Sequence, residues 1–317
     1  MDVTRRALLL LVLNFLPMTS SGPSCQNKDR SESCTSNCES YKFYTCLNIF
    51  KVGDFYHYAR SAIQYDKVWF ALKDGELDYY PAGVFMDYNV SVLEFDRAKV
   101  KSYAQFGSGP NPFWGLEDSL EFVMFKDSTL PDTWGMLNRL KKLEKLEFHK
   151  FKNLPLTRDF NELPPSLNRV YIYKSRIGYI DDGWLSELKN LRLVIIRESH
   201  LKKFTRSMLP RPASALTELD LEINSLTSLP SDIGEDMPVL EFLNIGRNNL
   251  TTFREDSLRP LRRNATYVHM FGNPLHCDCH LRFLLSYPES WTYALCHTPA
   301  KLKGRYLQTL TSDDLSC

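Results

Sequence analysis

The sequence predicts an α/β solenoid, in which short parallel strands stack into one curved sheet and irregular segments return on the convex side. Three observations lead to this prediction. An apolar pattern recurs along most of the chain, the 8 cysteines are confined to its two ends, and the charges nearly balance, with 39 Lys and Arg against 38 Asp and Glu. The near-zero net charge gives no reason to expect a general nucleic-acid binder, because such proteins need a surplus of basic residues.

Residues 1–22 have the pattern of a secretory signal peptide. Arg5 and Arg6 precede an apolar run at 7–16, and small residues follow at 19–22. The run is too short for a bilayer span of about 20 residues, and neither a later span nor an apolar tail for a lipid anchor follows. We therefore expect a secreted, extracellular glycoprotein, with N-glycosylation sequons at Asn89, Asn249 and Asn264.

The cysteines predict a disulfide-bonded cap at each end of the chain. No cysteine occurs between residues 47 and 276, and an even number lies on either side of that stretch. In an exported chain this distribution indicates two disulfide modules, which we place at 23–66 and 265–317. Their members are Cys25, Cys34, Cys38 and Cys46, then Cys277, Cys279, Cys296 and Cys317.

The middle of the chain is a repeat. Residues 216–226 fit L-x-x-L-x-L-x-x-N-x-L, and the pattern returns 24 residues later at 240–250. Copies begin near 67, 90, 120, 143, 167, 191, 216, 240 and 265. The pattern identifies the chain as a leucine-rich repeat protein, with about eight repeats at 67–264 and a last copy inside the C-terminal cap. Segments such as 80–85 and 229–233 predict a 3₁₀-like or irregular convex side.

The asparagine of the L-x-x-L-x-L-x-x-N-x-L pattern is present only in the copies near the C-terminal end. Asn224, Asn248 and Asn273 occupy this place, where the side chain satisfies buried backbone groups that would otherwise cost about 1–3 kcal/mol each. Serine can replace part of this function, but alanine and phenylalanine cannot. We therefore expect local irregularity, filled by water or a shifted turn, in the earlier copies, which carry Gly75, Ala98, Ser128, Phe151, Ser175 and Ser199.

The C-terminal cap resembles the cysteine cap of extracellular leucine-rich repeat proteins. The resemblance rests on residues 273–281 with Trp291, Cys296 and Cys317. It implies the pairs Cys277–Cys296 and Cys279–Cys317. The N-terminal cysteines are separated by eight, three and seven residues, which departs from the family's spacing and leaves their pairing open.

Residues 70–85 are similar to a group of secreted arthropod leucine-rich repeat proteins named after the non-catalytic subunit of the Oplophorus shrimp luciferase complex. The resemblance implies a binding or stabilising partner protein. The chain also has no G-x-S-x-G, H-E-x-x-H, P-loop or dinucleotide fingerprint, so no enzyme activity and no cofactor are predicted. The segment 276–280 contains zinc-ligand residue types, but disulfides explain its cysteines better, and we expect no metal.

The candidate binding site lies on the concave face, at the positions beside the inward-facing leucines. Large apolar side chains gather there in the middle copies, on a face that should meet water, with histidine and arginine among them, as in protein-binding hot spots. The alternative is ordinary strand composition, because aromatic and β-branched residues favour strands. The candidate residues are Phe122, Met124, His149, Arg169, Tyr171, Tyr173, Leu193, Ile195 and Arg197.

Two further segments are candidate contact sites. Residues 107–115 form a Gly/Pro loop with Phe113 and Trp114, which either contacts a partner or packs back onto the solenoid. The C-terminal end is locally basic, and a sulfated glycan would suit it, although nearby acids make a solvated face the simpler interpretation. Its cations are Arg259, Arg262, Arg263, Arg282, Lys301, Lys303 and Arg305.

These observations predict a secreted, non-catalytic recognition protein that binds an extracellular protein through its concave face. It would act as a subunit of an extracellular complex or as an innate-immune recognition factor. The alternative is a matrix or adhesion component that binds sulfated glycan through its basic C-terminal cap. Salt would separate the two, since glycan binding should weaken steeply with ionic strength. The sequence does not fix the oligomeric state.

Overall fold

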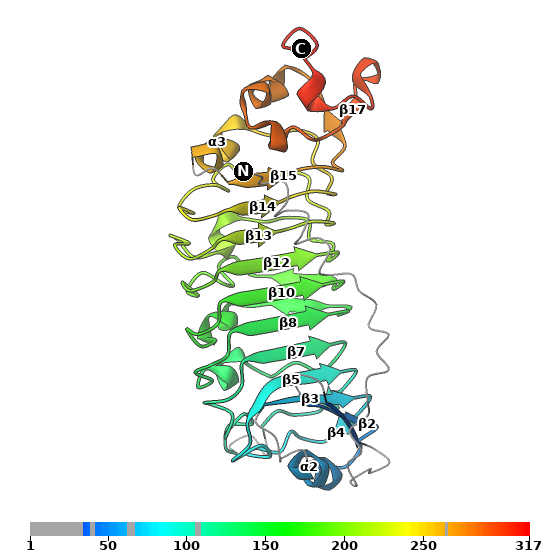
Figure 1. The fold of residues 1–317 in the computed structure, drawn as a ribbon, viewed down its shortest axis with the longest axis vertical. Helices are drawn as coiled ribbons and strands as arrows, with labels where there is room; N and C mark the ends of the chain where they lie inside the picture. Colours follow the sequence, from blue (N-terminus) through cyan, green and yellow to red (C-terminus); the bar gives the residue numbers. More distant parts are fainter. Residues whose placement is uncertain (1–33, 39–41, 62–66, 105–108, 264–265) are drawn as a thin grey trace.

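The computed structural model describes residues 34–38, 42–61, 67–104, 109–263 and 266–317, and it shows one long stack of strands (Figure 1). The strands form an 11-stranded sheet in the order β1-β2-β3-β5-β7-β8-β10-β12-β13-β14-β15, parallel except for β1. Each repeat contributes one strand, which confirms the predicted solenoid. These strands are β3 (Val68–Lys73), β5 (Val90–Asp96), β7 (Phe122–Lys126), β8 (Lys145–His149), β10 (Arg169–Tyr173), β12 (Leu193–Arg197), β13 (Glu218–Asp220), β14 (Phe242–Asn244) and β15 (Tyr267–His269).

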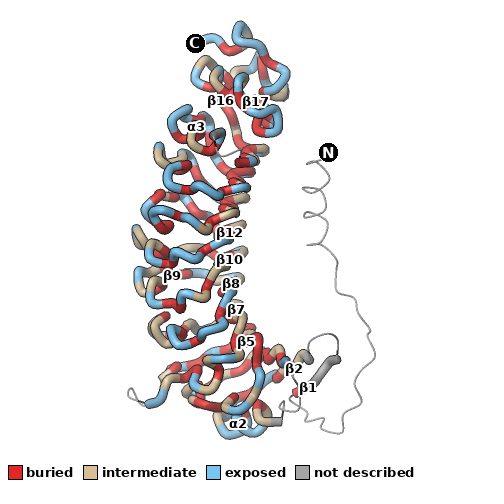
Figure 2. Tube along the Cα trace, turned by 60° about the vertical axis from the view of Figure 1, so that its left-hand side comes forward, coloured by how far each residue is buried: buried red, intermediate tan, exposed pale blue. Residues whose placement is uncertain are grey.

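Alternation along each strand separates the core from the concave face. In β10, Val170 and Ile172 are fully buried, whereas Arg169, Tyr171 and Tyr173 are half-buried on the other side of the sheet. Successive side chains of a strand point to opposite faces, so the apolar set of every repeat enters one continuous core. Buried positions accordingly recur in every coil of the stack (Figure 2).

The convex side is built from short turns of helix, as the sequence predicted. Three of them are η2 (Trp134–Leu137), η3 (Arg158–Glu162) and η4 (Arg206–Met208). They send large side chains into the core, where the ring of Phe160 packs 4.5 Å from Trp134 and 5.2 Å from Trp184. The convex side therefore closes the core without long helices.

The N-terminal end of the stack is covered by a hairpin and a helix. β1 (Cys34–Cys38) pairs antiparallel with β2 (Lys42–Leu47), β2 extends the sheet beside β3, and a disulfide joins Cys34 to Cys46. α2 (Val52–Ser61) inserts Phe55 against Phe70 and Phe85. The predicted signal segment 1–22 and Cys25 lie outside the described residues, as does the side chain of Cys38.

The C-terminal end is closed by a compact cap with two disulfides. They join Cys277 to Cys296 and Cys279 to Cys317, which is the pairing implied by the family resemblance. The indole of Trp291 is buried and donates a hydrogen bond to the carbonyl of Thr266 at 3.1 Å. The elements here are α3 (Glu255–Arg263), β16 (Leu275–His276), η5 (Cys279–Ser286), η6 (Glu289–Trp291), β17 (Cys296–Thr298), η7 (Ala300–Leu302) and η8 (Leu307–Thr309).

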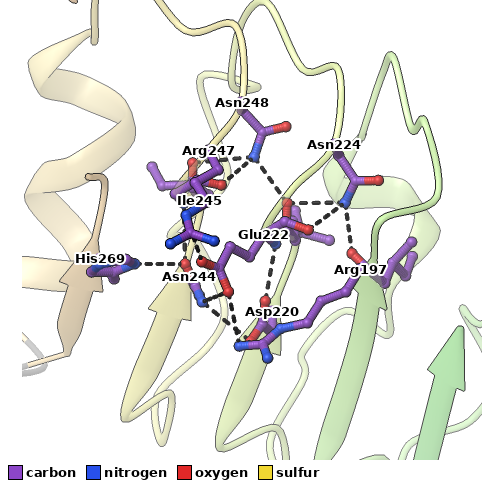
Figure 3. Close-up of polar contacts among 12 residues, drawn as sticks. Arg197, Asp220, Glu222, Asn224, Asn244, Ile245, Arg247, Asn248 and His269 are labelled. Carbon is purple, nitrogen blue, oxygen red and sulfur yellow. Dashed lines mark hydrogen bonds and ion pairs between the residues drawn. The ribbon is translucent and has the colours of Figure 1, made fainter. Parts of the chain in front are cut away.

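The turns after the strands follow two designs. Near the C-terminus, asparagines bind the backbone of the coil before them. The side-chain amide of Asn224 donates to Ile196 O, and that of Asn248 donates to Leu221 O (Figure 3). Their Oδ1 atoms accept from Leu201 N and Leu226 N respectively. In the earlier coils, hydroxyls replace them: Oγ of Ser175 accepts from Phe151 N.

The copies with Ala98 and Phe151 use additional strand pairs rather than an asparagine. β4 (Glu76–Leu77) pairs with β6 (Lys99–Val100), and β9 (Leu154–Leu156) pairs with β11 (Ile177–Ile180), with a register shift in the second pair. In these copies the structure therefore has strand pairs in place of the water or shifted turn that we expected from the sequence. Among the described residues, no helix is both long and apolar enough to cross a membrane.

Candidate functional site: the concave face

Strand register arranges the concave side chains in three rows. Phe122 lies opposite Lys145, which lies opposite Arg169, and Met124, Glu147 and Tyr171 line up in the next row. Because neighbouring parallel strands are about 4.8 Å apart, side chains of one row touch along the stack. The rows match those expected from the sequence, so the candidate residues do share one face.

The N-terminal half of this face carries two series of ring contacts. Phe43 of β2 packs on Trp69 with 4.9 Å between ring centroids, and Trp69 reaches over Val92 to Phe122 at 5.9 Å. Further along, Tyr171 stacks on Tyr173 at 5.9 Å and Tyr173 stacks on His149 at 5.2 Å. We call these two series, together with the lysine that joins them, the concave ladder: Phe43, Trp69, Phe122, Lys145, Tyr171, Tyr173 and His149.

Lys145 connects the two parts of the concave ladder. Its ammonium nitrogen lies 4.2 Å from the ring centroid of Phe122 and 4.6 Å from that of Tyr171. Each such cation–π contact is worth about 0.5–2 kcal/mol, depending on how far it is desolvated. The lysine therefore fixes both rings in one arrangement before any partner arrives.

A buried acid lies beneath Lys145 and His149 of the concave ladder. Glu147 is 7% exposed, forms an ion pair with Lys145 and is hydrogen-bonded to His149. Burial of Glu147 raises its pKa, but the hydrogen bond from His149 and the charge of Lys145 outweigh burial and lower the pKa below its ordinary value. The carboxylate is therefore ionised at neutral pH.

Acids and cations alternate on the remainder of the face. Asp96 lies between Arg97 at 2.6 Å and Lys126. Arg197 pairs with the buried Asp220 at 2.5 Å and with Glu222 at 3.1 Å (Figure 3). These pairs neutralise the cations within the chain and leave rings as the main uncharged contact groups.

The predicted residues are brought together, but they differ in exposure. Phe122, Met124, Tyr171, Tyr173 and Leu193 are half-buried, with one side of each open to the concave space. The expectation that every apolar member meets water is wrong for one residue. Ile195 is only 8% exposed between its strand neighbours Tyr171 and Asp220, so it supports the surface rather than forming it. Arg169 pairs with Glu144 at 2.8 Å.

Three members of the concave ladder were not among the sequence candidates. Phe43 lies in the N-terminal cap, which lacks the repeat pattern, and only the pairing of β2 with β3 places it beside Trp69. Trp69 and Lys145 stand in the first row of the repeat pattern. Both could have been included from the sequence, because their position in the row and the size of their side chains follow from it directly.

A second, more exposed group of rings lies at the C-terminal end. Phe242 stacks on Tyr267 at 5.7 Å. Phe271 stacks on Tyr293 at 6.1 Å, and Tyr293 on Tyr306 at 4.8 Å. The charged pairs of β12 and β13 separate this group from the concave ladder.

The two aromatic residues of the predicted contact loop differ in burial. Phe113 is buried against Tyr80 and Tyr103, with centroids 5.7 and 6.2 Å away. Trp114 is 49% exposed, and its ring lies beside Gly83. Residues 105–108 lie outside the described residues.

The basic cap largely uses its cations internally. Arg259 pairs with Asp256 at 2.8 Å, Arg305 pairs with Asp314 at 3.1 Å, and Arg282 donates to the carbonyl of Leu315 at 2.7 Å. Arg262 lies over the ring of Tyr287, Lys301 donates to Ser316 Oγ, and the side chain of Arg263 is outside the described residues.

The segment 276–280 offers no thiolate to a metal. Cys279, His280 and Cys317 lie close together, but the two sulfurs are bonded to each other. Of the three sequons, Asn89 and Asn249 are exposed, as glycan attachment requires, and Asn264 lies outside the described residues.

Sequence comparison shows similarity to known leucine-rich repeat proteins. A leucine rich repeat family model matches residues 214–275. The chain is 26% identical over 204 residues to Toll-like receptor 9 of Mus musculus, covering 59% of this chain and 20% of the receptor. It is 29% identical over 115 residues to lumican of Gallus gallus, covering 36% of this chain and 33% of lumican.

Solved structures share the fold. One is a chain of the octameric complex of Latrophilin 3, Unc5D and FLRT2, whose leucine-rich repeat component is FLRT2, with a TM-score of 0.56 and 21% identity over 79% of this chain and 82% of that one. Another is human 5T4, with a TM-score of 0.53 and 18% identity over 87% and 95%. The chain is thus a leucine-rich repeat protein related to extracellular leucine-rich repeat proteins, and it spans a third or less of the two curated relatives named above.

Proposed function

We propose that this chain is an extracellular, non-catalytic recognition protein that binds another protein through the concave ladder. The observation that carries the proposal is the series of rings from Phe43 to Tyr173, whose two parts are joined by Lys145 on one sheet. Aromatic side chains that are already ordered lose little conformational entropy on binding, and such anchors dominate the energy of protein interfaces.

The disulfides and the relatives support an extracellular site of action. Disulfides persist in oxidising compartments and are rare in the cytosol. FLRT2, which shares the fold, is part of a complex with two other proteins. A role as the non-catalytic subunit of an extracellular complex, or as an innate-immune recognition factor, is consistent with a surface of this kind.

The sulfated-glycan alternative at the C-terminal cap receives less support. Arg259, Arg282 and Arg305 are engaged by groups of the chain itself, so a glycan sulfate would have to displace those partners.

A pull-down from the native extracellular fluid tests the proposal. The intact protein is compared with Phe122→Ala/Tyr171→Ala and with the control Tyr179→Ala, a similarly sized exposed ring on β11. We expect one protein to be retained by the intact chain and the control and lost with the double variant, each variant being checked for its melting temperature. If all three retain the same protein, the concave ladder is not the binding site.

A further inference from the structure

A groove runs along the edge of the solenoid, where the chain leaves the carboxyl ends of β8, β10 and β12. Its volume is about 920 Å³, and it crosses five successive coils. We call it the edge groove. Its lining consists of Lys150, Phe151, Lys152, Lys174, Arg176, Glu198, His200, Ile223, Asn224, Ser225 and Asn249.

One end of the edge groove is strongly basic. Lys150, Lys152, Lys174 and Arg176 are all exposed there, and among the lining residues Glu198 is the one acid. Lys174 approaches Glu198 at 3.9 Å. The other three form no ion pair within the described part of the chain, in contrast to the neutralised cations of the concave face and the engaged arginines of the cap.

Backbone hydrogen bonds fix the positions from which these side chains extend. Lys150 N donates to Tyr173 O at 3.2 Å, Lys174 N donates to Arg197 O at 3.1 Å, and Arg176 N donates to Phe151 O at 2.8 Å. Lys150 and Lys174 occupy the same place in consecutive coils, with φ of 60° and 49°. The stack repeats at about 4.8 Å, so their Cα atoms are spaced at about that interval. The two lysine side chains therefore extend from neighbouring coils, where one bound anion could be attracted by both charges.

The rest of the lining suits a sugar rather than an ion alone. Phe151 and Ile223 are half-buried and offer apolar contact for a ring face. Ser225 and His200 offer groups that can donate or accept hydrogen bonds with hydroxyls. The sequon residue Asn249 lies three coils from Arg176, at about 14 Å, so a glycan attached there would leave the basic end open.

We propose that the edge groove binds an anionic polysaccharide, with Lys152 and Arg176 contacting its sulfate groups. Arginine presents a planar donor fork to a tetrahedral oxyanion, and lysine adds a point charge. This site is separate from the concave ladder, so the chain could hold a protein and a polysaccharide simultaneously.

Surface plasmon resonance with an immobilised heparin dodecasaccharide tests the site on the full, disulfide-bonded chain. We expect Lys152→Ser/Arg176→Ser to weaken binding at least about tenfold, because one hydrogen bond to a charged group contributes on that order. The salt dependence should become less steep. The control Lys301→Ser/Lys303→Ser, which removes two exposed cations of the cap, should change affinity less than about twofold.

Several outcomes would overturn the assignment. Equal binding by the intact chain and the groove variant would do so, and a larger loss with the cap control would move the site to the cap. Unsulfated hyaluronan serves as the second probe: binding as strong as that of heparin would reduce the claim from sulfate to carboxylate recognition. Polyglutamate binding as tightly as either polysaccharide would show an acidic-peptide site. Phe122→Ala/Tyr171→Ala should retain heparin, which keeps this test independent of the proposed function.

Discussion

Asn248→Ala tests how the C-terminal coils are held together. The side chain is 4% exposed, and its amide donates to Leu221 O at 2.9 Å, Ile245 O at 3.2 Å and Gly246 O at 3.1 Å. Its Oδ1 accepts from Leu226 N at 3.0 Å.

The expected loss of stability depends on which backbone groups still have a hydrogen-bond partner once the Asn248 side chain is removed. Leu221 O still accepts from Asn224, Ile245 O from Asn273 and Gly246 O from Ile223 N, so these carbonyls lose one of two bonds. Leu226 N loses its acceptor in a buried position. An unsatisfied buried donor costs about 1–3 kcal/mol and the shared bonds less, so we expect a loss of about 3 kcal/mol in the free energy of unfolding.

Urea denaturation of the oxidised protein, followed by circular dichroism, measures this loss. Asn138→Ala is the matched control, because Asn138 is exposed and follows η2 on the convex side. Asn248→Ser should recover part of the loss, since Ser175 and Ser199 accept comparable backbone bonds in earlier coils. A loss within 0.5 kcal/mol of that control, a margin typical of surface substitutions, would refute the reasoning.

Three further predictions concern the pH response, a buried cation and a turn. Burial lowers the pKa of His269 below its ordinary value of 6.5, so at low pH the unfolded chain binds a proton more readily than the folded chain does. The stability of the folded chain should therefore fall as the pH decreases through 6.5. In thermal melts between pH 7 and pH 5, His269→Gln should reduce that loss. Arg206 is 1% exposed and donates to four carbonyls, including Pro210 O at 2.8 Å and Glu235 O at 2.9 Å. Arg206→Met should therefore lower the free energy of unfolding, measured by urea denaturation, by about 3 kcal/mol. Gly115 has φ of +89°, and a Cβ there would lie 2.8 Å from Met86 Cα, so Gly115→Ala should lower the melting temperature, with an energetic cost of about 2 kcal/mol. An unchanged pH profile, unfolding curve or melting temperature would contradict the respective prediction.

Much of the fold could be predicted because one spacing determines both strand position and strand register. The interval between Leu216 and Leu240 places Glu218 opposite Phe242, and alternation then assigns each side chain to a face. The caps have no such interval. The position of Phe43 beside Trp69 therefore required the structure.

Exposure on the concave face was harder to predict than position. Ile195 has the same alternation as Tyr171, yet the shorter side chain is covered while the tyrosine ring extends past its neighbours. The edge groove was not predicted because its cations follow the strands in turns, where the repeat pattern constrains the backbone but not the residue type. Lys152 and Arg176 come together only through stacking of consecutive coils.

The most direct test of the central claim locates the partner on the surface. A photoreactive phenylalanine analogue is introduced at Tyr171, in the concave ladder, or at Tyr179, on β11, and each protein is irradiated in native extracellular fluid. The account predicts that the analogue at Tyr171 crosslinks to one protein, which also copurifies with the intact chain, and that the analogue at Tyr179 does not. Crosslinking of that protein from position 179 alone would contradict recognition through the concave face.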